Sequence, residues 1–476
     1  MDKNKLTFDE IEKNIGWNRD PVGFLFYKDD KVFRAINNSH IDDVHELFDC
    51  GLVDELNRAG VIPHTTISNY YLEGYDLILE HERITVVSYP PEWSFTMLKD
   101  AALIVIQVNK ILSKYGYETK DAHNYNILFD STTPKFVDFG SFARRAHKKY
   151  WICRDEFVRF YFYPLYMWSK GNSILARKIL SDSAGYITDY EFQLYKYKFM
   201  RWLPKNFMRS IFINLEYVRN LSRYNIDTLP IIKKAGIKRK IIKIIYAFSK
   251  LGLLPNNYTN LNRLESKIKR LKAPGLKSLW GEYHTVTESK DAFSKESRFN
   301  IVLKLIKKYN IISVLEIGGN QGLFARELST HIDKVICSDY DENAVDQMYI
   351  KSKTEYISIS PVLLNFLHPF SRATNFSEKV STFNRFNSQA VIALALTHHL
   401  ILTQKVPINI IFEAIGRYNR EYLFIEFMPK GVSKLPPPDW YTIDWFRDNF
   451  KRYYQLLDEV ITTEDNGRIL FVGKKL

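Results

Sequence analysis

In the C-terminal part of the chain, short apolar runs alternate with amphipathic stretches. The apolar runs predict strands at residues 311–317, 334–338, 390–396, 422–428 and 468–473. The stretches between them, beginning with residues 299–309, have apolar positions at helical spacing. Strands that alternate with helices predict a parallel sheet covered by helices on both faces, which is the α/β class.

Residues 1–230 have a different order of elements. Their start predicts a β-hairpin over 23–36 that turns at Asp29 and Asp30. A helix, strands at 75–80 and 84–87, and a long helix over 97–115 follow. Two short strands joined by a loop are expected next, up to Gly140. Helices rich in aromatic residues follow them. Small strands first and helices later predict a two-lobed α+β domain.

Length and composition narrow the class of protein. At about 100–200 residues per domain, 476 residues suit two or three domains, and 46% hydrophobic residues exclude a wholly disordered chain. Three widely spaced cysteines argue against a disulfide framework or a zinc site. The charged start has no secretory signal, and no apolar run approaches the ~20 residues of a membrane span. We therefore expect a cytoplasmic protein.

The net charge of +13 is concentrated in one region. Residues 201–280 contain 18 Lys and Arg against 3 acidic residues, so the rest of the chain is almost neutral. This confinement disfavours a nucleic-acid-binding chain. Residues 231–250 read as a basic amphipathic helix. It could pack on a domain with a solvated lysine face, or it could meet anionic lipid or a phosphate-bearing carrier. We divide the chain into residues 1–230, a basic helical connector at 231–279, and residues 280–476.

The strongest chemical pattern begins at the predicted strand that contains Glu316. A glycine-rich loop follows it, with Gly318, Gly319, Asn320 and Gly322. Glycines let the backbone pass close to a ligand, and the N-terminus of the next helix favours a polar or anionic group there. The second strand leads into Asp339, whose carboxylate can accept both ribose hydroxyls of a nucleoside.

The order Glu-x-Gly-x-x-x-Gly departs from the dinucleotide-binding Gly-x-Gly-x-x-Gly and resembles motif I of class I S-adenosylmethionine (SAM)-dependent methyltransferases. Residues 280–476 resemble the rhizobial nodulation-type methyltransferases, which also occur among predicted enzymes of surface-polysaccharide loci. The resemblance implies a Rossmann-like, seven-stranded domain. It implies that the loop and Glu316 hold the methionine part of SAM and that Asp339 holds the ribose. It assigns Asn365 to the adenine, and Trp280 and Tyr283 to an aromatic segment over the cofactor.

Three residues are candidates for catalysis. His398 and His399 follow the fourth predicted strand, where the carboxyl ends of strands line the ligand crevice, and a neutral histidine can take the proton of an acceptor hydroxyl. Of the two we favour His399. Glu426, on the fifth strand, can orient a histidine or bind the acceptor. The alternatives are histidines that only pack in the loop and a buried acid held by backbone N–H groups. Methyl transfer can also run on positioning alone.

The loop at 397–400 lacks the Asn/Asp-Pro-Pro-aromatic motif of amino-directed nucleic-acid methyltransferases. We therefore expect methylation of a hydroxyl oxygen. The resemblance implies that the acceptor is a sugar of a surface glycan or of its lipid-linked precursor. Methylation of RNA stays as the alternative.

The N-terminal part carries a second pattern. Asp121 precedes Asn126 by five residues, and Asp138-Phe139-Gly140 begins 12 residues after Asn126. Phosphoryl transfer needs an acid near the acceptor hydroxyl, and an Asn and a second Asp that hold metal on the nucleotide phosphates. The pattern resembles the catalytic loop of aminoglycoside and choline phosphotransferases, which have a protein-kinase-like fold. The resemblance implies Asp121 as the base, and Asn126 and Asp138 as Mg²⁺ ligands with ATP.

Three features depart from that family. Thr119 and Lys120 stand where the family has His-Arg or His-Gly before the acid. Arg34 stands where the family has a strand lysine; we expect it to pair with Glu46 and to reach an ATP phosphate, although arginine and lysine are not interchangeable. The family's glycine-rich loop is missing near the first hairpin. A kinase-like domain that phosphorylates the same glycan and a catalytically dead binding module therefore both stay open. If residues 231–250 bind a phosphorylated carrier or an anionic membrane, we expect the protein at the inner face of the membrane as a peripheral protein.

Overall fold

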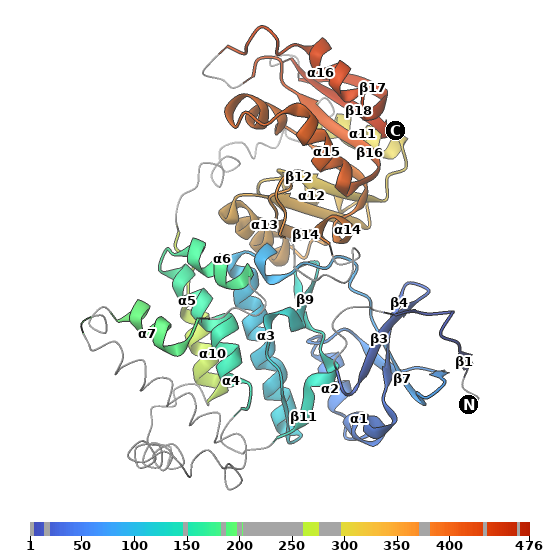
Figure 1. Ribbon diagram of the computed structural model, residues 1–476, viewed down its shortest axis with the longest axis vertical. Helices are drawn as coiled ribbons and strands as arrows, with labels where there is room; N and C mark the ends of the chain where they lie inside the picture. The colour runs from blue at the N-terminus through green and yellow to red at the C-terminus, as the bar shows by residue number, and fades with distance from the viewer. Residues whose placement is uncertain are drawn as a thin grey trace, which may run out of the picture.

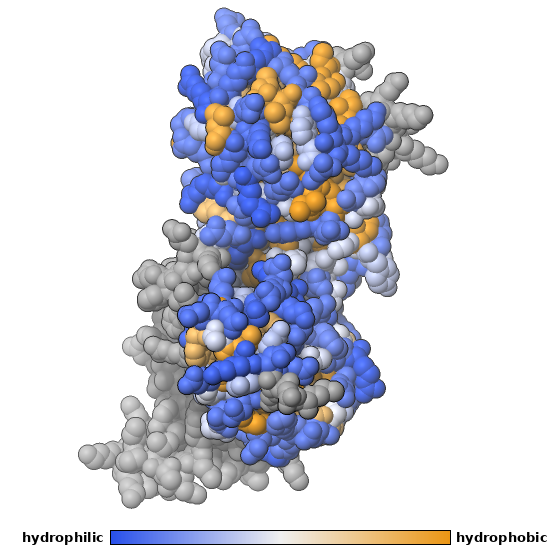
Figure 2. Space-filling view, turned by 90° about the vertical axis from the view of Figure 1, so that its right-hand side faces the viewer, coloured by the Kyte–Doolittle hydropathy of each residue, from blue (hydrophilic) through white to orange (hydrophobic). Residues whose placement is uncertain are grey.

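The computed structural model describes residues 4–13, 20–145, 151–181, 187–197, 202, 260–275, 297–370, 381–431, 436–463 and 467–476. Residues 231–250, Trp280 and Tyr283 lie outside the described residues. Two domains stack along the long axis, with the C-terminal domain at the top of Figure 1. On the face drawn in Figure 2, exposed apolar side chains gather mainly on this upper domain. Within the described ranges, no helix has the length and apolar character to cross a membrane.

The N-terminal domain begins with an antiparallel sheet of five strands. In spatial order these are β2 (Glu12–Lys13), β3 (Gly23–Lys28), β4 (Lys31–Ile36), β7 (Leu77–His81) and β5 (Thr65–Ile67). The predicted hairpin is present, because Asp29 and Asp30 both have the positive φ that a tight turn between β3 and β4 requires. β1 (Asn4–Leu6) and β6 (Tyr70–Leu72) form a separate pair, and α1 (Ile41–Asp49) and α2 (Leu52–Arg58) follow β4.

The second lobe of this domain is built around α3 (Phe95–Lys114), which begins at the N-cap Ser94. Beside it lie α4 (Arg154–Phe157), α5 (Tyr163–Ser169), α6 (Ser173–Ser181) and α7 (Asp189–Lys196), with the strand pairs β8 (Tyr117–Thr119) with β11 (Phe142–Arg144) and β9 (Ile127–Asp130) with β10 (Thr133–Phe136). The described part of the expected connector contains α10 (Leu261–Arg270). This helix packs on α3, because Leu264 and Ile268 are buried in the N-terminal core.

The C-terminal domain contains one sheet of seven strands. In spatial order these are β14 (Ser360–Leu363), β13 (Lys334–Asp339), β12 (Ser313–Ile317), β15 (Ser388–Ala393), β16 (Asn419–Phe427), β18 (Arg468–Lys475) and β17 (Tyr454–Thr463). The first five strands are parallel, and β18 runs antiparallel to both β16 and β17. The strand order reverses between β12 and β15. In sheets of this kind, ligands bind at such a switch point, beyond the carboxyl ends of the strands.

Helices cover both faces of this sheet, because successive strand residues point to opposite sides. One face packs on α11 (Arg298–Lys308), α12 (Leu323–Leu328) and α13 (Glu342–Thr354). The other packs on α15 (Ile408–Tyr418) and α16 (Ile443–Phe450), and α14 (Thr382–Arg385) lies just before β15. This arrangement confirms the predicted Rossmann-like α/β architecture.

The two domains meet where α13 packs on α3. The backbone N–H and the hydroxyl of Thr96 donate to the Asp346 carboxylate at 2.8 and 2.9 Å. The Tyr349 hydroxyl and the Lys353 ammonium both donate to Asp100, at 2.8 and 2.6 Å. The ring of Tyr349 is fully buried in the N-terminal core. The interface between the two domains, called the seam below, is therefore both polar and apolar.

The expected strand at 84–87 is wrong. These residues form no strand, because their apolar side chains have another use: Val86 is buried in the core of the C-terminal domain. Beside it, Arg385 donates to the carbonyl oxygen of Val87 at 2.6 Å and to both carboxylate oxygens of Glu92 at 2.5 and 2.8 Å. The segment therefore joins the two domains.

We predict that Glu92→Gln destabilises the chain by about 3–5 kcal/mol, because it leaves the buried Arg385 charge unpaired. The side chains of Arg385 and Glu92 are only 6% and 1% exposed. Urea denaturation of the full chain measures the free energy of unfolding. The control Glu80→Gln opens the more exposed pair with Lys31 and should change stability far less. Equal losses in the two variants would contradict this account of the seam.

Candidate functional site

The glycine-rich loop joins β12 to α12 at the switch point of the sheet. Gly318 and Gly322 have φ values of +74° and +72°, which residues with a side chain rarely adopt. A Cβ on Gly319 would lie 2.3 Å from Sγ of Cys337, and one on Gly322 would lie 2.7 Å from Cγ of Met348. The loop is thus packed tightly on β13 and α13, and these glycines are required for its position.

Asp339, at the carboxyl end of β13, meets this loop directly. Its Oδ2 accepts the backbone N–H of Asn320 at 2.8 Å, and its Oδ1 accepts that of Asp341 at 2.8 Å. Burial raises the pKa of the Asp339 carboxyl, and these two hydrogen bonds act in the opposite direction. The loop and the carboxylate therefore converge on one place, as a nucleoside site requires.

Glu316 lies under the loop, where its side chain is 4% exposed. Burial raises its pKa to about 7, against the opposing effects of the Cys337 thiol and the Arg298 guanidinium. The thiol donates to Oε2 of Glu316 at 3.5 Å. A cationic ligand above the loop would favour the ionised form of this carboxyl.

Asn365 follows β14, on the next strand along from Asp339. Its Oδ1 accepts the backbone N–H groups of Leu367 and His368, both at 3.2 Å, and so closes a turn. With its oxygen used in this turn, a contact with adenine would use the Nδ2 group, which donates to a ring nitrogen.

The two histidines differ in exposure. His398 is 4% exposed, and its Nδ1 has no hydrogen-bond partner in the described part of the chain. Burial lowers its pKa to about 3, and the neighbouring His399 and Arg468 lower it further in the same direction. His399 keeps part of its surface, and burial lowers its pKa as well. Both rings are therefore neutral at pH 7, and His399 is the one with access to solvent.

Glu426 is completely buried in β16. Its Oε2 accepts the backbone N–H of Ala395 at 2.9 Å and lies 3.3 Å from Nη1 of Arg298; its Oε1 accepts the Thr462 hydroxyl at 3.2 Å. Ala395 has a φ of +52°, a strained value for a residue with a Cβ. Glu426 thus holds the loop that leads to the histidines. This arrangement matches the alternative in which Glu426 is a buried acid held by backbone N–H groups.

The N-terminal pattern is also drawn together. Nδ2 of Asn126 donates to Oδ2 of Asp138 at 3.4 Å. Burial raises the pKa of Asp138 to about 6; Arg34 opposes this effect, and the nearby carboxylates of Asp20 and Asp121 add to it. Among the described residues, no group of three or more His, Cys, Asp or Glu side chains could hold a metal ion. A cation between Asn126 and Asp138 would therefore need phosphate oxygens to complete its coordination.

The expected pair between Arg34 and Glu46 is wrong. Arg34 is buried and pairs with Asp20, whereas Glu46 pairs with Arg144 on β11. Asp20 lies against the backbone of Gly140, where a Cβ would be 2.1 Å from its Oδ2. Asp20 is the residue that sequence reasoning missed, because a single acid before Pro21 forms no recognisable pattern.

No protein-family model matches the chain. The chain is 23% identical over 426 residues to the nodulation protein NoeA of Rhizobium meliloti (strain 1021), over 87% of this chain and 84% of that protein. It is similar in structure to the PH0226 protein of Pyrococcus horikoshii OT3, with a TM-score of 0.33, 16% identity, and coverage of 42% of this chain and 100% of that chain. It is also similar to the N-methyltransferase NodS of Bradyrhizobium japonicum WM9, with a TM-score of 0.29, 15% identity, and coverage of 39% and 98%.

The fold of the C-terminal domain follows from its own sheet. Five parallel strands in the order β14-β13-β12-β15-β16, extended by the antiparallel β18 and by β17, confirm the class I methyltransferase fold that the sequence predicts. The kinase-like fold of the N-terminal domain stays a prediction.

Proposed function

We propose that the C-terminal domain is a SAM-dependent methyltransferase that methylates a sugar hydroxyl of a surface glycan or of its lipid-linked precursor. The observation that carries this proposal is the 2.8 Å hydrogen bond between the Asn320 backbone and the Asp339 carboxylate. It brings the glycine-rich loop and the second-strand acid to the same point at the switch point of the sheet. A nucleoside with a charged tail needs both groups there.

SAM, when bound, supplies an electrophilic methyl group on a sulfonium. The residues of the chain would hold it by their positions. Each oxygen of Asp339 accepts one backbone N–H and keeps lone pairs for a ribose hydroxyl. Glu316 would favour the cationic methionine part, and the Nδ2 group of Asn365 would be the one available to donate to the adenine. Gly318, Gly319 and Gly322 let the backbone come close to the ligand.

His399 would act as the base for the acceptor hydroxyl. It follows the carboxyl end of β15, is neutral at pH 7 and is partly exposed. A ring nitrogen of His399 would take the proton of the acceptor hydroxyl. Glu426 fixes the preceding loop through Ala395 and Arg298, and His398 packs behind His399 with the ring centres 4.0 Å apart.

The substrate class rests on the family resemblance and on the likeness to a nodulation protein. The basic residues at 231–250 would hold a phosphorylated carrier or the anionic membrane surface. Methylation of RNA is the alternative, and it would use the same basic residues, which lie outside the described residues.

The second candidate function is binding of ATP with Mg²⁺ and phosphorylation of the same glycan by the N-terminal domain. The contact between Asn126 and Asp138 favours it, because these two residues would hold the metal and Asp121 would act on the acceptor hydroxyl. The pair between Arg34 and Asp20 must open before Arg34 can reach a phosphate. A domain in which this pair stays closed is the catalytically dead binding module.

We predict that Asp339→Ala weakens SAM binding at least about 100-fold, because it removes two charge-assisted hydrogen bonds to the ribose. Isothermal titration calorimetry measures the affinity, and circular dichroism checks that the variant is folded. The control Asp333→Ala removes an exposed acid just before β13 and should bind SAM normally. Wild-type affinity in the Asp339 variant would rule out the proposed site.

We predict that His399→Ala lowers the rate of methyl transfer about 10²–10⁴-fold and leaves SAM affinity unchanged, because it removes the base and no cofactor contact. The assay follows the labelled methyl group of SAM into surface polysaccharide from the source organism. The control Lys405→Ala changes an exposed residue of the same loop. A full rate in the His399 variant would assign this histidine a packing role only.

We predict that ATP with Mg²⁺ raises the melting temperature of the full chain, and that Asp138→Ala abolishes this rise because it removes a metal ligand. Differential scanning fluorimetry measures the shift. Asp130→Ala changes an exposed residue at the end of β9 in the same domain; it is the matched control and should keep the shift. Absence of any shift in the wild-type chain would argue against the second candidate function.

A further inference from the structure

A cavity of about 1160 Å³ lies where the two lobes of the N-terminal domain meet the C-terminal domain. It is separate from the proposed SAM site, and it is lined by Tyr125 and Val137, the neighbours of Asn126 and Asp138. Its lining from the C-terminal domain includes Lys334, the first residue of β13, and Arg420, near the start of β16. Asp339 ends β13 and His399 follows the carboxyl end of β15, so both lie at the opposite side of the sheet. The cavity therefore lies at the amino-terminal edge of the sheet, and the cofactor loop lies at the carboxyl edge.

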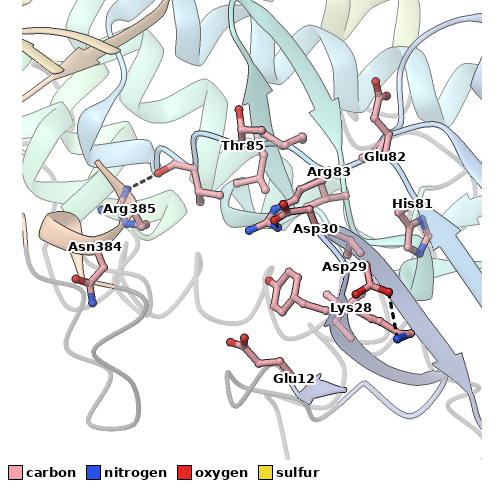
Figure 3. A pocket seen from close by; sticks show the side chains of 18 of the residues that line it. Glu12, Lys28, Asp29, Asp30, His81, Glu82, Arg83, Thr85, Asn384 and Arg385 are labelled. Atoms are coloured by element: carbon pink, nitrogen blue, oxygen red, sulfur yellow. Dashed lines mark hydrogen bonds and ion pairs between the residues drawn. The ribbon is translucent and has the colours of Figure 1, made fainter. Parts of the chain in front are cut away.

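The two walls of this cavity differ in charge. The C-terminal domain contributes three cations, two amides and no carboxylate: Lys334, Arg385, Arg420, Asn384 and Asn387. All the lining carboxylates belong to the N-terminal domain: Asp9, Glu10, Glu12, Asp29, Asp30 and Glu82. Figure 3 shows Asn384 and Arg385 at one side of the cavity, Arg83 between the walls, and Asp29, Asp30 and Glu12 toward the first hairpin.

Two of the cations on the C-terminal wall are not neutralised. The Lys334 ammonium donates to the carbonyl oxygen of Asn387 at 3.3 Å, and Arg420 donates to the Ser313 hydroxyl at 3.4 Å. Among the residues that the structure describes, neither of them forms an ion pair with a carboxylate. Arg385 differs, because Glu92 already neutralises it.

A third cation approaches from the N-terminal domain. Arg83 lines the same cavity, and its ion-pair partner within the described ranges is Asp30, whose side chain is 98% exposed. Burial lowers the pKa of Lys334, and the positive charges of Arg420 and Arg83 lower it further. Cations from two domains that face one another in this way leave a place where an anion would be stabilised by all three.

The opposite wall suits a different part of the same ligand. Carboxylates accept hydrogen bonds from hydroxyl groups, and several of them line the wall formed by the first hairpin. Tyr27, Tyr89 and Tyr125 also line the cavity and offer ring faces to the apolar face of a sugar. A ligand with an anionic group at one end and hydroxyl groups at the other matches both walls.

We propose that this cavity binds a phosphorylated sugar, with the phosphate on Lys334, Arg420 and Arg83 and the sugar hydroxyls toward the carboxylates of the N-terminal domain. The volume is large enough for a free sugar phosphate or for a nucleoside diphosphate sugar. This proposal is independent of the methyltransferase reaction.

The test is isothermal titration of the full chain with four probes: glucose 1-phosphate, UDP-glucose, glucose and inorganic phosphate. We expect one or both phosphorylated sugars to bind, and glucose and inorganic phosphate to bind at least about tenfold more weakly, because each fills only one wall. The variant Lys334→Gln/Arg420→Gln should lose at least about tenfold in affinity, since hydrogen bonds to charged groups contribute about 1.5–3 kcal/mol. The relative affinity of the two phosphorylated probes distinguishes a free sugar phosphate from a nucleotide sugar.

The matched control is Lys304→Gln, which removes an exposed lysine of α11 outside the cavity and should bind the probes as the wild type does. Failure of both phosphorylated probes to bind the wild-type chain would overturn the proposal. Equal affinity in the double variant, or glucose or inorganic phosphate binding as tightly as glucose 1-phosphate, would also overturn it. SAM affinity should be the same in all these chains, so a failure here and a failure of the methyltransferase proposal are distinguishable.

Discussion

Helix α13 is held between the glycine-rich loop and the N-terminal domain. The proposed SAM site and the cavity between the domains both depend on that packing. On one side, Met348 fills the space beside Gly322, and Lys351 donates to the Gln321 side chain at 2.9 Å. On the other side, Asp346 and Tyr349 bind α3. Because a helix is stiff over its length, the loop position and the domain seam are mechanically linked. The N-terminal domain is therefore part of the scaffold of the cofactor site.

The same packing also orients the C-terminal sheet. With α13 fixed on α3, the amino-terminal edge of the sheet faces the N-terminal lobes, and its carboxyl edge is left for the loop, Asp339 and the histidines. The acidic and neutral groups that suit a cationic cofactor are at one edge, and the cations Lys334 and Arg420 are at the other. Two ligands of opposite charge can therefore be bound by one sheet without competing for the same side chains.

The sequence was sufficient for features that depend on local pattern. Short apolar runs located β12, β13, β15, β16 and β18, and the order of glycines located the loop at the switch point. β17 was not predicted, because most residues of this edge strand are only partly buried and Tyr454–Thr463 has no clear alternation of apolar and polar residues. The run at 84–87 looked like a strand, but Val86 packs in the core of the other domain. A contact between domains leaves no periodic signal in the sequence.

Side-chain partners were the least predictable part of the site. Arg34 turns to Asp20 rather than to Glu46, because it lies inside the lobe, while Glu46 lies nearer the surface. Glu426 was a candidate for catalysis, and its burial with Arg298 and Thr462 became visible only in three dimensions. Pairing of charges depends on distances between elements far apart in the chain, which residue spacing alone does not give.

Each domain also contributes an apolar side chain to the core of the other, since Tyr349 lies in the N-terminal core and Val86 in the C-terminal core. Either domain folded alone would have a cavity in its core and an exposed apolar side chain on its surface. The two halves therefore behave as one cooperative unit. A fragment cut at the connector is a poor substitute for the intact polypeptide in any assay of either half.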